Sequence, residues 1–274
     1  MSSSNKSQSL PNGYKLLDSG DGRKFEQFGA LKLIRPSSTA IWTPRKKNWQ
    51  ADSEYIPKQG WSKNVSGSHK IECINGIELD INLQNNGQIG IFPEHQSYLS
   101  DLSPTANSRA LNLFAYTGLA TCYLASQGMD VTHVDISKKC LDWANDNIKY
   151  NKVGDNVRLI KEDSLAFLAK ESKRGKKYDL ILLDPPSFSR VSKNKTWDLE
   201  KVLPEFVGLL AEIINPNFTI CFTSHLHQGF NEIVGNLFLD TLGDDVTIER
   251  KSLTISEADS ARKLPASNLI KIHA

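Results

Sequence analysis

Residues 176–195 read KKYDLILLDPPSFSRVSKNK: two lysines lead into an apolar run that stops at Asp184, Pro185 and Pro186. Such a run, bounded by polar residues, is typical of a strand buried inside a sheet. Proline fixes φ and has no backbone N–H, so the chain must leave the sheet in a rigid, non-helical conformation. We therefore expect a buried strand with a rigid corner at its carboxyl end.

The same strand-then-helix pattern repeats on both sides of this stretch. The strand-like segments are RALNLFA (109–115), DVTHVDI (130–136), NVRLIKED (156–163), YDLILLD (178–184) and FTICFTS (218–224). Amphipathic segments of helix length separate them, and this alternation predicts an α/β fold with a mostly parallel sheet and helices on both faces. The late segments 245–255 and 268–274 have no long helix between them, so we expect an antiparallel hairpin at the sheet edge.

The N-terminal part has a different pattern. Residues 69–83 alternate apolar and polar positions around Asn75-Gly76, which is a strong hairpin signal because a type I′ turn needs two positive φ angles. A second Asn-Gly before residues 88–92 suggests a three-stranded meander, and residues 30–42 suggest a strand–turn–strand unit. The expected organisation is a disordered tail (1–9), a β-rich region (10–95) and an α/β domain (96–274).

Composition limits the class of protein. The chain has 274 residues and a formal net charge of +2, so any affinity for nucleic acid must come from local basic patches. Its four cysteines lie far apart, which fits a reducing compartment better than a disulfide framework. The polar N-terminal tail lacks the apolar region of a signal peptide, and no run approaches the ~20 apolar residues of a membrane span. These observations predict a cytoplasmic protein without a membrane segment.

Polar residues follow four of the predicted strands, where an open α/β sheet binds its ligands. The first strand ends in NLFAYTG (112–118), the second in Asp135, the third in Asp163 and the fourth in Asp184. A turn with a single glycine argues against a pyrophosphate cradle and for a smaller ligand without phosphates. Asp135 suits ribose hydroxyls and Asp163 an adenine amino group, although each could instead cap the following helix.

The ordered set of strand ends resembles the class I S-adenosylmethionine-dependent methyltransferases, which have a Rossmann-like sheet. The resemblance covers roughly residues 86–274 and is closer to bacterial enzymes that methylate bases of 23S ribosomal RNA, with a D-P-P-[KTS]-F corner and a segment similar to GIFPEHQ (90–96). It implies S-adenosyl-L-methionine as cofactor and RNA as partner. The cofactor-binding residues it implies are Phe114, Tyr116, Gly118, Asp135, Ile136, Asp163, Ser164 and Asp184.

For catalysis, the resemblance implicates the corner formed by Asp184, Pro185, Pro186 and Phe188. We expect its backbone carbonyls to point at the substrate and Phe188 to stack on a target base. The plainer alternatives are a rigid turn without a ligand and a phenylalanine packed in the core.

The methylated atom is the hardest point. Methylation at carbon 5 of cytosine needs a thiolate, and the cytosine-specific relatives have a cysteine where this chain has Ser224. Cys221 lies inside the predicted strand and is expected to be buried and inert. We therefore favour a guanine nitrogen over cytosine carbon 5. His225 and His227 lie next to this strand end, but their spacing without a further ligand predicts no metal site.

Two basic stretches suit RNA. Residues 42–63 interleave basic residues with three of the five tryptophans, and single-stranded RNA offers base faces and phosphates together. Arg190, Lys193 and Lys195 follow the proline corner and could contact phosphates. The stretch 170–177 is better explained as a solvated loop. Rival hypotheses are a protein or small-molecule methyltransferase, a non-catalytic cofactor- or RNA-binding module, and a nicotinamide-dependent dehydrogenase.

Overall fold

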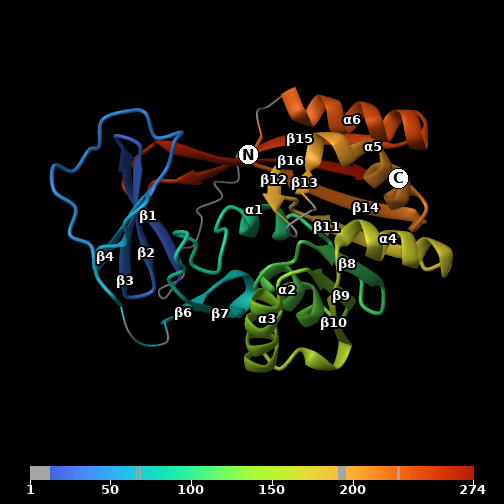
Figure 1. The fold of residues 1–274 in the computed structure, drawn as a ribbon, viewed down its shortest axis with the longest axis horizontal. Helices are drawn as coiled ribbons and strands as arrows, with labels where there is room; N and C mark the ends of the chain where they lie inside the picture. Colours follow the sequence, from blue (N-terminus) through green and yellow to red (C-terminus); the bar gives the residue numbers. More distant parts are fainter. Residues whose placement is uncertain (1–12, 66, 68, 191–195, 227–228) are drawn as a thin grey trace, which may run out of the picture. The chain divides into compact units, whose positions relative to one another are not determined.

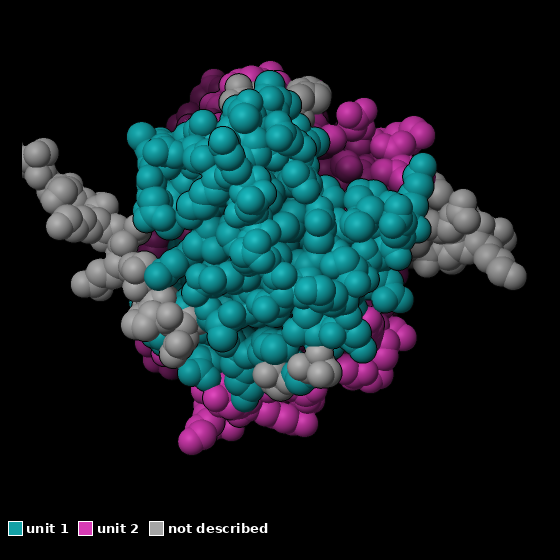
Figure 2. All heavy atoms as spheres, turned by 90° about the vertical axis from the view of Figure 1, so that its left-hand side faces the viewer, with its two compact units in different colours: residues 1–96, 254–265 teal, residues 97–253, 266–274 magenta. Residues whose placement is uncertain are grey.

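A computed structural model describes residues 13–65, 67, 69–190, 196–226 and 229–274 (Figure 1). The chain forms two compact units, coloured separately in Figure 2: unit 1 comprises residues 1–96 and 254–265, and unit 2 comprises residues 97–253 and 266–274. The sequence did not suggest that residues 254–265 belong with the N-terminal part. The predicted tail, residues 1–9, lies outside the described residues.

Unit 1 contains a five-stranded sheet in the order β1-β2-β3-β4-β5. Its strands are β1 (Tyr14–Gly20), β2 (Arg23–Phe28), β3 (Leu31–Pro36), β4 (Ser53–Ile56) and β5 (Gly60–Trp61). The first three strands are antiparallel, and β3 pairs with β4 in parallel. The expected second strand after Pro36 is not formed. Instead the carbonyls of Ala40 and Trp42 accept hydrogen bonds from the β1–β2 turn.

The hairpin at Asn75-Gly76 is present, as β6 (His69–Glu72) and β7 (Glu78–Ile81), which pair antiparallel. Asn75 and Gly76 have φ of 52° and 73°, so the turn has the two positive angles that its sequence predicted. The expected third strand of a meander is not formed: the following segment is a turn in which Asn82 N donates to Ile89 O, Gln84 N to Gln88 O and Gly87 N to Gln84 O.

Unit 2 is built on a seven-stranded sheet in the order β10-β9-β8-β11-β14-β16-β15, of which residues 254–256 of β15 and 263–265 of β16 belong to unit 1. The strands are β8 (Arg109–Leu113), β9 (Asp130–Asp135), β10 (Val157–Lys161), β11 (Tyr178–Leu183), β14 (Ile214–Ser224), β15 (Thr247–Ser256) and β16 (Lys263–His273). The pairings from β10 to β14 are parallel, and β16 runs antiparallel to β14. The mostly parallel α/β fold with an antiparallel edge is therefore confirmed. A small hairpin, β12 (Phe188–Arg190) and β13 (Thr196–Asp198), follows β11.

Five of the described helices form two packed groups. The described helices are α1 (His95–Leu99), α2 (Leu119–Ser126), α3 (Lys138–Tyr150), α4 (Ser164–Lys173), α5 (Leu199–Ala211) and α6 (Gly229–Leu242), with single 3₁₀ turns η1 (Ile74–Gly76) and η2 (Gly154–Asn156). Helix α5 packs against α4 and α6, whereas α2 packs against α3, and Figure 1 shows the two groups apart. The α4–α6 group covers a core of buried aromatic side chains that includes Tyr178, Phe206 and Phe222. None of the described helices combines the length and apolar character that crossing a bilayer requires.

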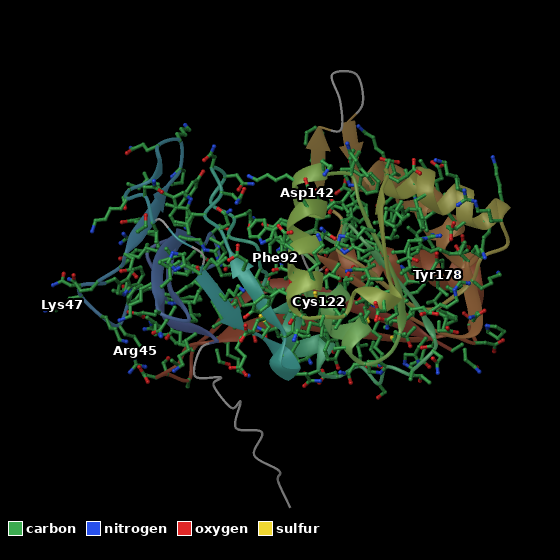
Figure 3. The ribbon with its side chains drawn as sticks, turned by 90° about the horizontal axis from the view of Figure 1, so that it is seen from below. Arg45, Lys47, Phe92, Cys122, Asp142 and Tyr178 are labelled. Carbon is green, nitrogen blue, oxygen red and sulfur yellow. The ribbon has the colours of Figure 1, made fainter. Side chains whose placement is uncertain are left out.

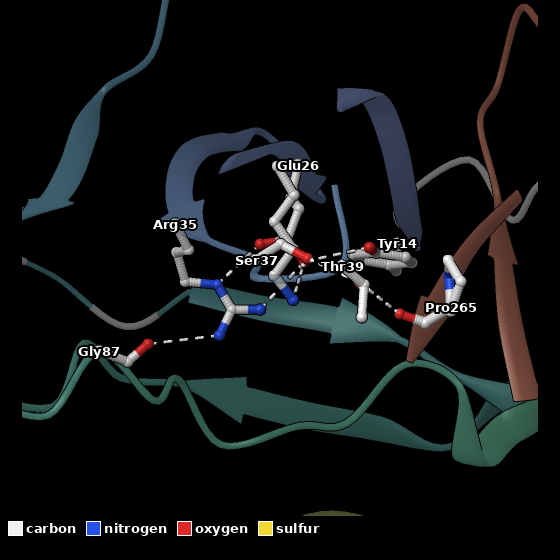
Figure 4. A network of polar contacts seen from close by, with 8 residues as sticks. Tyr14, Glu26, Arg35, Ser37, Thr39, Gly87 and Pro265 are labelled. Carbon is white, nitrogen blue, oxygen red and sulfur yellow. Dashed lines mark hydrogen bonds and ion pairs between the residues drawn. The ribbon is translucent and has the colours of Figure 1, made fainter. Parts of the chain in front are cut away.

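The sheet of unit 1 contains a buried ionic network (Figure 4). Glu26 is fully buried and accepts hydrogen bonds from Arg35 Nε at 2.7 Å, Arg35 Nη2 at 3.0 Å and Tyr14 Oη at 3.0 Å, while Lys24 Nζ lies 3.2 Å away. Arg35 Nη1 also donates to Gly87 O at 3.3 Å. Burial raises the pKa of Glu26, but the charges of Arg35 and Lys24 outweigh it, so the pKa is lowered from 4.5. The network joins β1, β2 and β3 to the turn that follows β7.

We predict that Glu26→Gln lowers the free energy of unfolding of unit 1 by about 3–5 kcal/mol, because a buried guanidinium loses its counter-charge. Denaturant unfolding with a tryptophan fluorescence readout measures the change. Glu54→Gln is the matched control, since Glu54 pairs with Arg23 at the surface and such pairs contribute about 0–1 kcal/mol. Equal effects of the two substitutions would contradict the assignment.

The same network predicts a pH dependence. A carboxyl whose folded pKa lies below its unfolded value stabilises the protein above the unfolded pKa and loses this contribution as the pH falls through the folded pKa. For Glu26 the loss therefore begins below pH 4.5. Acid titration of the wild type against Glu26→Gln tests this, and parallel stability curves between pH 6 and pH 3 would refute it.

Candidate functional site

Four parallel strands of unit 2 end at one edge of the sheet. Leu113, the last residue of β8, pairs with Val134 of β9 on one side and with Leu183 of β11 on the other. The residues that follow these positions, Phe114, Asp135 and Asp184, therefore emerge together. Strand β10 ends beside Asp135, because Lys161 is paired with it. This is the edge at which open α/β sheets bind ligands.

The loop after β8 is tightly wound. Phe114, Tyr116 and Gly118 have φ of 54°, 52° and 92°, and a left-handed conformation is unusual for the two aromatic residues. Tyr116 N donates to Asp135 Oδ2 at 2.9 Å, which ties the tips of β8 and β9 together. Backbone strain of this kind clusters at ligand sites. At Gly118 an added Cβ would lie 3.3 Å from the Cβ of Ala144, so the close packing of α2 on α3 also favours glycine here.

Asp135 is half-buried and oriented by the backbone. Its Oδ1 accepts from Ser137 N at 2.8 Å, and its Oδ2 accepts from Tyr116 N. Burial raises its pKa more than these hydrogen bonds and one from Ile136 lower it. The cap of α3 is Ser137, whose side chain accepts from Cys140 N at 3.2 Å, so Asp135 is not the helix cap. A carboxylate has about four acceptor positions, which leaves room for two ribose hydroxyls.

The residues after β10 cap the next helix, and an exposed apolar side chain follows the neighbouring strand β9. The side chain of Asp163 accepts from Ala166 N at 3.2 Å and caps α4, as the plainer alternative anticipated. Ser164 is 4% exposed, whereas Ile136, which follows Asp135, is 46% exposed and offers an apolar surface to a planar ring. Contacts of Asp163 and Ser164 with adenine, and of Ile136 with the cofactor, stay predictions.

Phe114, predicted to bind the cofactor, packs against aromatic side chains of the core. Its ring centroid lies 5.1 Å from that of Trp197 and 6.1 Å from that of Phe206, in edge-on and tilted arrangements. Direct contact of Phe114 with the cofactor stays a prediction. Its observed contribution is to hold the β8 tip against β13 and α5.

The proline corner is held from two sides. Thr223 Oγ1 donates to Asp184 Oδ1 at 2.6 Å, which fixes the carboxylate against the end of β14. Trp197 Nε1 donates to Pro186 O at 2.6 Å. The carbonyl of Pro186 thus accepts an indole N–H, and the expectation that the corner's carbonyls point at a substrate stays a prediction. Pro185 is buried, and Pro186 is exposed.

Phe188 follows this corner on β12 and is 65% exposed. The alternative that it packs in the core is therefore wrong. Its neighbour across the hairpin is Asp198, and the adjacent Trp197 is buried at 4% exposure, so the hairpin is anchored while Phe188 faces outward. Sequence reasoning missed Trp197 and Thr223. The only signal for Thr223 was a hydroxyl residue next to the predicted strand end.

Ser224 ends β14 in a buried position, and its Oγ has no hydrogen-bond partner in the described part of the chain. His225 lies beside it, with Nδ1 3.2 Å from Ala266 O. His227, Lys193 and Lys195 lie outside the described residues, as does the side chain of Arg190. Among the described residues no cluster of histidine, cysteine and acidic side chains could hold a metal ion.

The chemistry of the site suits one kind of cofactor. Its strand tips carry carboxylates at Asp135, Asp163 and Asp184, and the β8 loop has a single glycine. Such a set favours a cationic nucleoside with free ribose hydroxyls over a phosphorylated dinucleotide. A sulfonium nucleoside such as S-adenosylmethionine fits: Asp135 would hold the ribose, Ile136 would face the adenine, and Asp184 would lie near the positive centre.

Comparison with known proteins gives the class. The family model of S-adenosylmethionine-dependent methyltransferases matches residues 60–224. The crystal structure of an S-adenosylmethionine-dependent methyltransferase from Agrobacterium tumefaciens is similar, with a TM-score of 0.88 and 28% sequence identity. The match covers 97% of this chain and 91% of that chain. A putative methyltransferase crystallised with SAH has the same fold, with a TM-score of 0.74, 17% identity, and coverage of 97% and 76% of the two chains.

This chain belongs to the S-adenosylmethionine-dependent methyltransferase family, and S-adenosylmethionine is its cofactor. Among curated proteins, the ribosomal RNA large subunit methyltransferase K/L of Magnetococcus marinus is 33% identical over 155 residues, which are 55% of this chain and 21% of that protein. The chain thus spans about a fifth of the length of the curated relatives that it matches.

We predict that Asp135→Asn weakens binding of S-adenosylhomocysteine about tenfold, because charge-assisted hydrogen bonds to the ribose are roughly twice as strong as neutral ones. Isothermal titration calorimetry measures the affinity. Asp142→Asn is the control, since Asp142 is exposed on α3 and pairs with Lys138. Unchanged affinity of the Asp135 variant would remove this residue from the site.

Proposed function

We propose that this protein transfers the methyl group of S-adenosylmethionine to a guanine nitrogen in large-subunit ribosomal RNA. The observation that carries the proposal is the exposed ring of Phe188 directly after the Asp184 corner. An aromatic residue at this place offers a platform for a planar acceptor. The names of the curated relatives support ribosomal RNA as the source of that acceptor.

A flipped or unpaired base would stack on Phe188. RNA is usually recognised through unstacked bases lying on aromatic side chains, and one such stack contributes about 1–3 kcal/mol. The anchored β12–β13 hairpin holds the ring outward before the substrate arrives, so little conformational entropy is lost on binding.

The chemistry requires positioning more than activation. The acceptor lone pair forms a bond to the methyl carbon while the carbon–sulfur bond breaks and its electron pair stays on sulfur. The protein must hold the two reactants in line at roughly 3 Å. In this proposal Phe188 orients the base plane, and Asp184, held by Thr223, faces the acceptor. An exocyclic amine then loses a proton to solvent, whereas N7 of guanine has none to lose.

A nitrogen acceptor is favoured over cytosine carbon 5 by the state of the cysteines. All four are described, and Cys122 and Cys221 are buried, which raises the pKa of both thiols to about 12. Burial also raises the pKa of Cys140, and Cys73 is fully buried. A thiolate nucleophile is thus lacking at the strand end, where Ser224 stands. Nitrogen methylation needs no covalent intermediate.

We predict that deleting the gene removes one base methylation from the host's large-subunit ribosomal RNA and that the wild-type gene restores it. Mass spectrometry of RNA nucleosides reports both the substrate and the modified atom. An unchanged nucleoside profile would point to a protein or small-molecule substrate. A lost 5-methylcytosine would overturn the choice of nitrogen and leave RNA as the substrate.

Phe188→Ala should lower kcat/KM on RNA by about 5- to 150-fold, which corresponds to the 1–3 kcal/mol of one stack. Phe188→Tyr should retain most of the activity, because it keeps the ring. The affinity for S-adenosylhomocysteine should stay unchanged in both variants. Equal activity of the alanine variant and the wild type would refute the stacking role.

Cys221→Ala should retain methylation within about an order of magnitude, because loss of a covalent nucleophile costs far more, on the order of 10⁶-fold. The assay transfers radiolabelled methyl groups to ribosomal RNA. A complete loss of transfer with cofactor affinity intact would restore the covalent mechanism.

A further inference from the structure

Unit 1 contains a cleft that lies outside the predicted cofactor and catalytic residues and is lined in part by the basic, tryptophan-containing stretch 42–63. It has a volume of about 490 Å³ and lies beside β4 and β5. Its wall includes Tyr55, Trp61, Lys58, Lys63, Asn64 and Asn85. We propose that this cleft binds a nucleotide of single-stranded RNA, with the base against the aromatic rings and the phosphate between the lysines. The inference rests on the proposed function and adds to it a substrate contact outside the methyl-transfer site.

The aromatic walls are held in place. The rings of Tyr55 and Trp61 meet edge to face, with centroids 5.3 Å apart. Tyr55 Oη donates to Asn85 O at 3.0 Å, and Trp61 Nε1 donates to Gln84 O at 2.8 Å. These bonds fix both rings against the turn after β7, so a base would meet surfaces that are already ordered.

Gly87 makes this arrangement possible. Its φ is 82°, and a Cβ added there would lie 2.7 Å from Cδ1 of Tyr55. A side chain at this position would push the Tyr55 ring out of the cleft wall. The Asn86-Gly87 turn therefore both reverses the chain direction and leaves room for the Tyr55 ring in the cleft wall.

The charge of the cleft is uncompensated. Lys58 and Lys63 are exposed, and neither forms an ion pair with a carboxylate of the described residues. The described wall contains no acidic residue. Two ammonium groups beside two aromatic rings match a nucleotide, which presents a phosphate and a base face together. The amides of Asn64 and Asn85 can donate to and accept from a base edge.

Other basic side chains of unit 1 are placed differently. Figure 3 shows Arg45 and Lys47 projecting outward from the 42–49 loop, which Asp18 holds by accepting hydrogen bonds from Arg45 N, Lys46 N and Trp49 Nε1. These side chains add positive charge, but neither belongs to the wall of the Tyr55–Trp61 cleft. The Tyr55–Trp61 cleft combines charge with concavity, and for that reason we assign the nucleotide to it.

The test measures binding of a fluorescein-labelled, single-stranded RNA octamer to the full chain by anisotropy across a range of salt concentrations. The slope of log K against log salt is negative, and each lost lysine–phosphate contact reduces its magnitude by about 0.7 for single strands. Lys58→Gln/Lys63→Gln should therefore reduce the magnitude of the slope by about 1.4. The control Lys173→Gln/Lys176→Gln removes the same charge from exposed lysines of unit 2 and should leave the slope unchanged.

Trp61→Ala should weaken binding of the octamer about tenfold, whereas Trp61→Phe should bind within about threefold of the wild type, because stacking tolerates either ring. A duplex of the same length should be insensitive to Trp61→Ala. Unchanged affinity for S-adenosylhomocysteine shows that unit 2 is intact in each variant, and far-UV circular dichroism checks unit 1.

The outcomes separate this inference from the proposed function. Suppose that the wild type methylates RNA and that both double lysine variants give the same salt slope. This result would refute nucleotide binding in the cleft and leave the methyl-transfer proposal standing. A slope of reduced magnitude for the Lys58/Lys63 variant alone, together with the Trp61 effect on single strands, supports the cleft. Binding of an acidic peptide that competes with the octamer at equal affinity would also overturn it, because charge alone would then explain the site.

Discussion

The parallel pairing of β8 with β9 and β11 is the constraint on which the site depends. Leu113 is in register with Val134 and Leu183, so the next residues of all three strands leave the sheet at the same level. The hydrogen bond from Tyr116 N to Asp135 Oδ2 then joins two of these tips. A slip of one residue in either pairing would turn alternate side chains to the opposite face and separate Asp135 from Asp184.

The two units have opposite electrostatic character where each has a candidate site. In unit 2 the strand tips carry carboxylates, which suit a cofactor with a sulfonium centre. In unit 1 the Tyr55–Trp61 cleft carries two lysines, which suit a polyanion. The net charge of +2 hides this division, because it sums acidic and basic regions that suit different ligands. Composition alone therefore says little about either ligand.

The structure shows hydrogen-bond and packing partners for several predicted site residues. The carbonyl of Pro186 was expected to face a substrate, and it also accepts a hydrogen bond from Trp197, which ties the corner to the hairpin that carries Phe188. Asp163 had two interpretations: the helix cap is observed, and the contact with adenine stays a prediction. Gly118 was predicted to bind the cofactor, and its neighbour Ala144 supplies a packing reason as well. For Pro186 and Gly118 the partner lies on another element, whereas Asp163 caps its own helix through Ala166 N.

The strand-to-helix alternation from residue 108 onward determined the α/β fold, because buried parallel strands need long apolar runs and crossover helices. The hairpin at Asn75-Gly76 was equally readable, since positive φ at two successive positions is a local property of those residues. Local pattern could not assign residues 254–265 to unit 1, expose Phe188 or form the Tyr55–Trp61 cleft. These features arise from contacts between segments far apart in the chain, and only the folded chain brings the contacting atoms together.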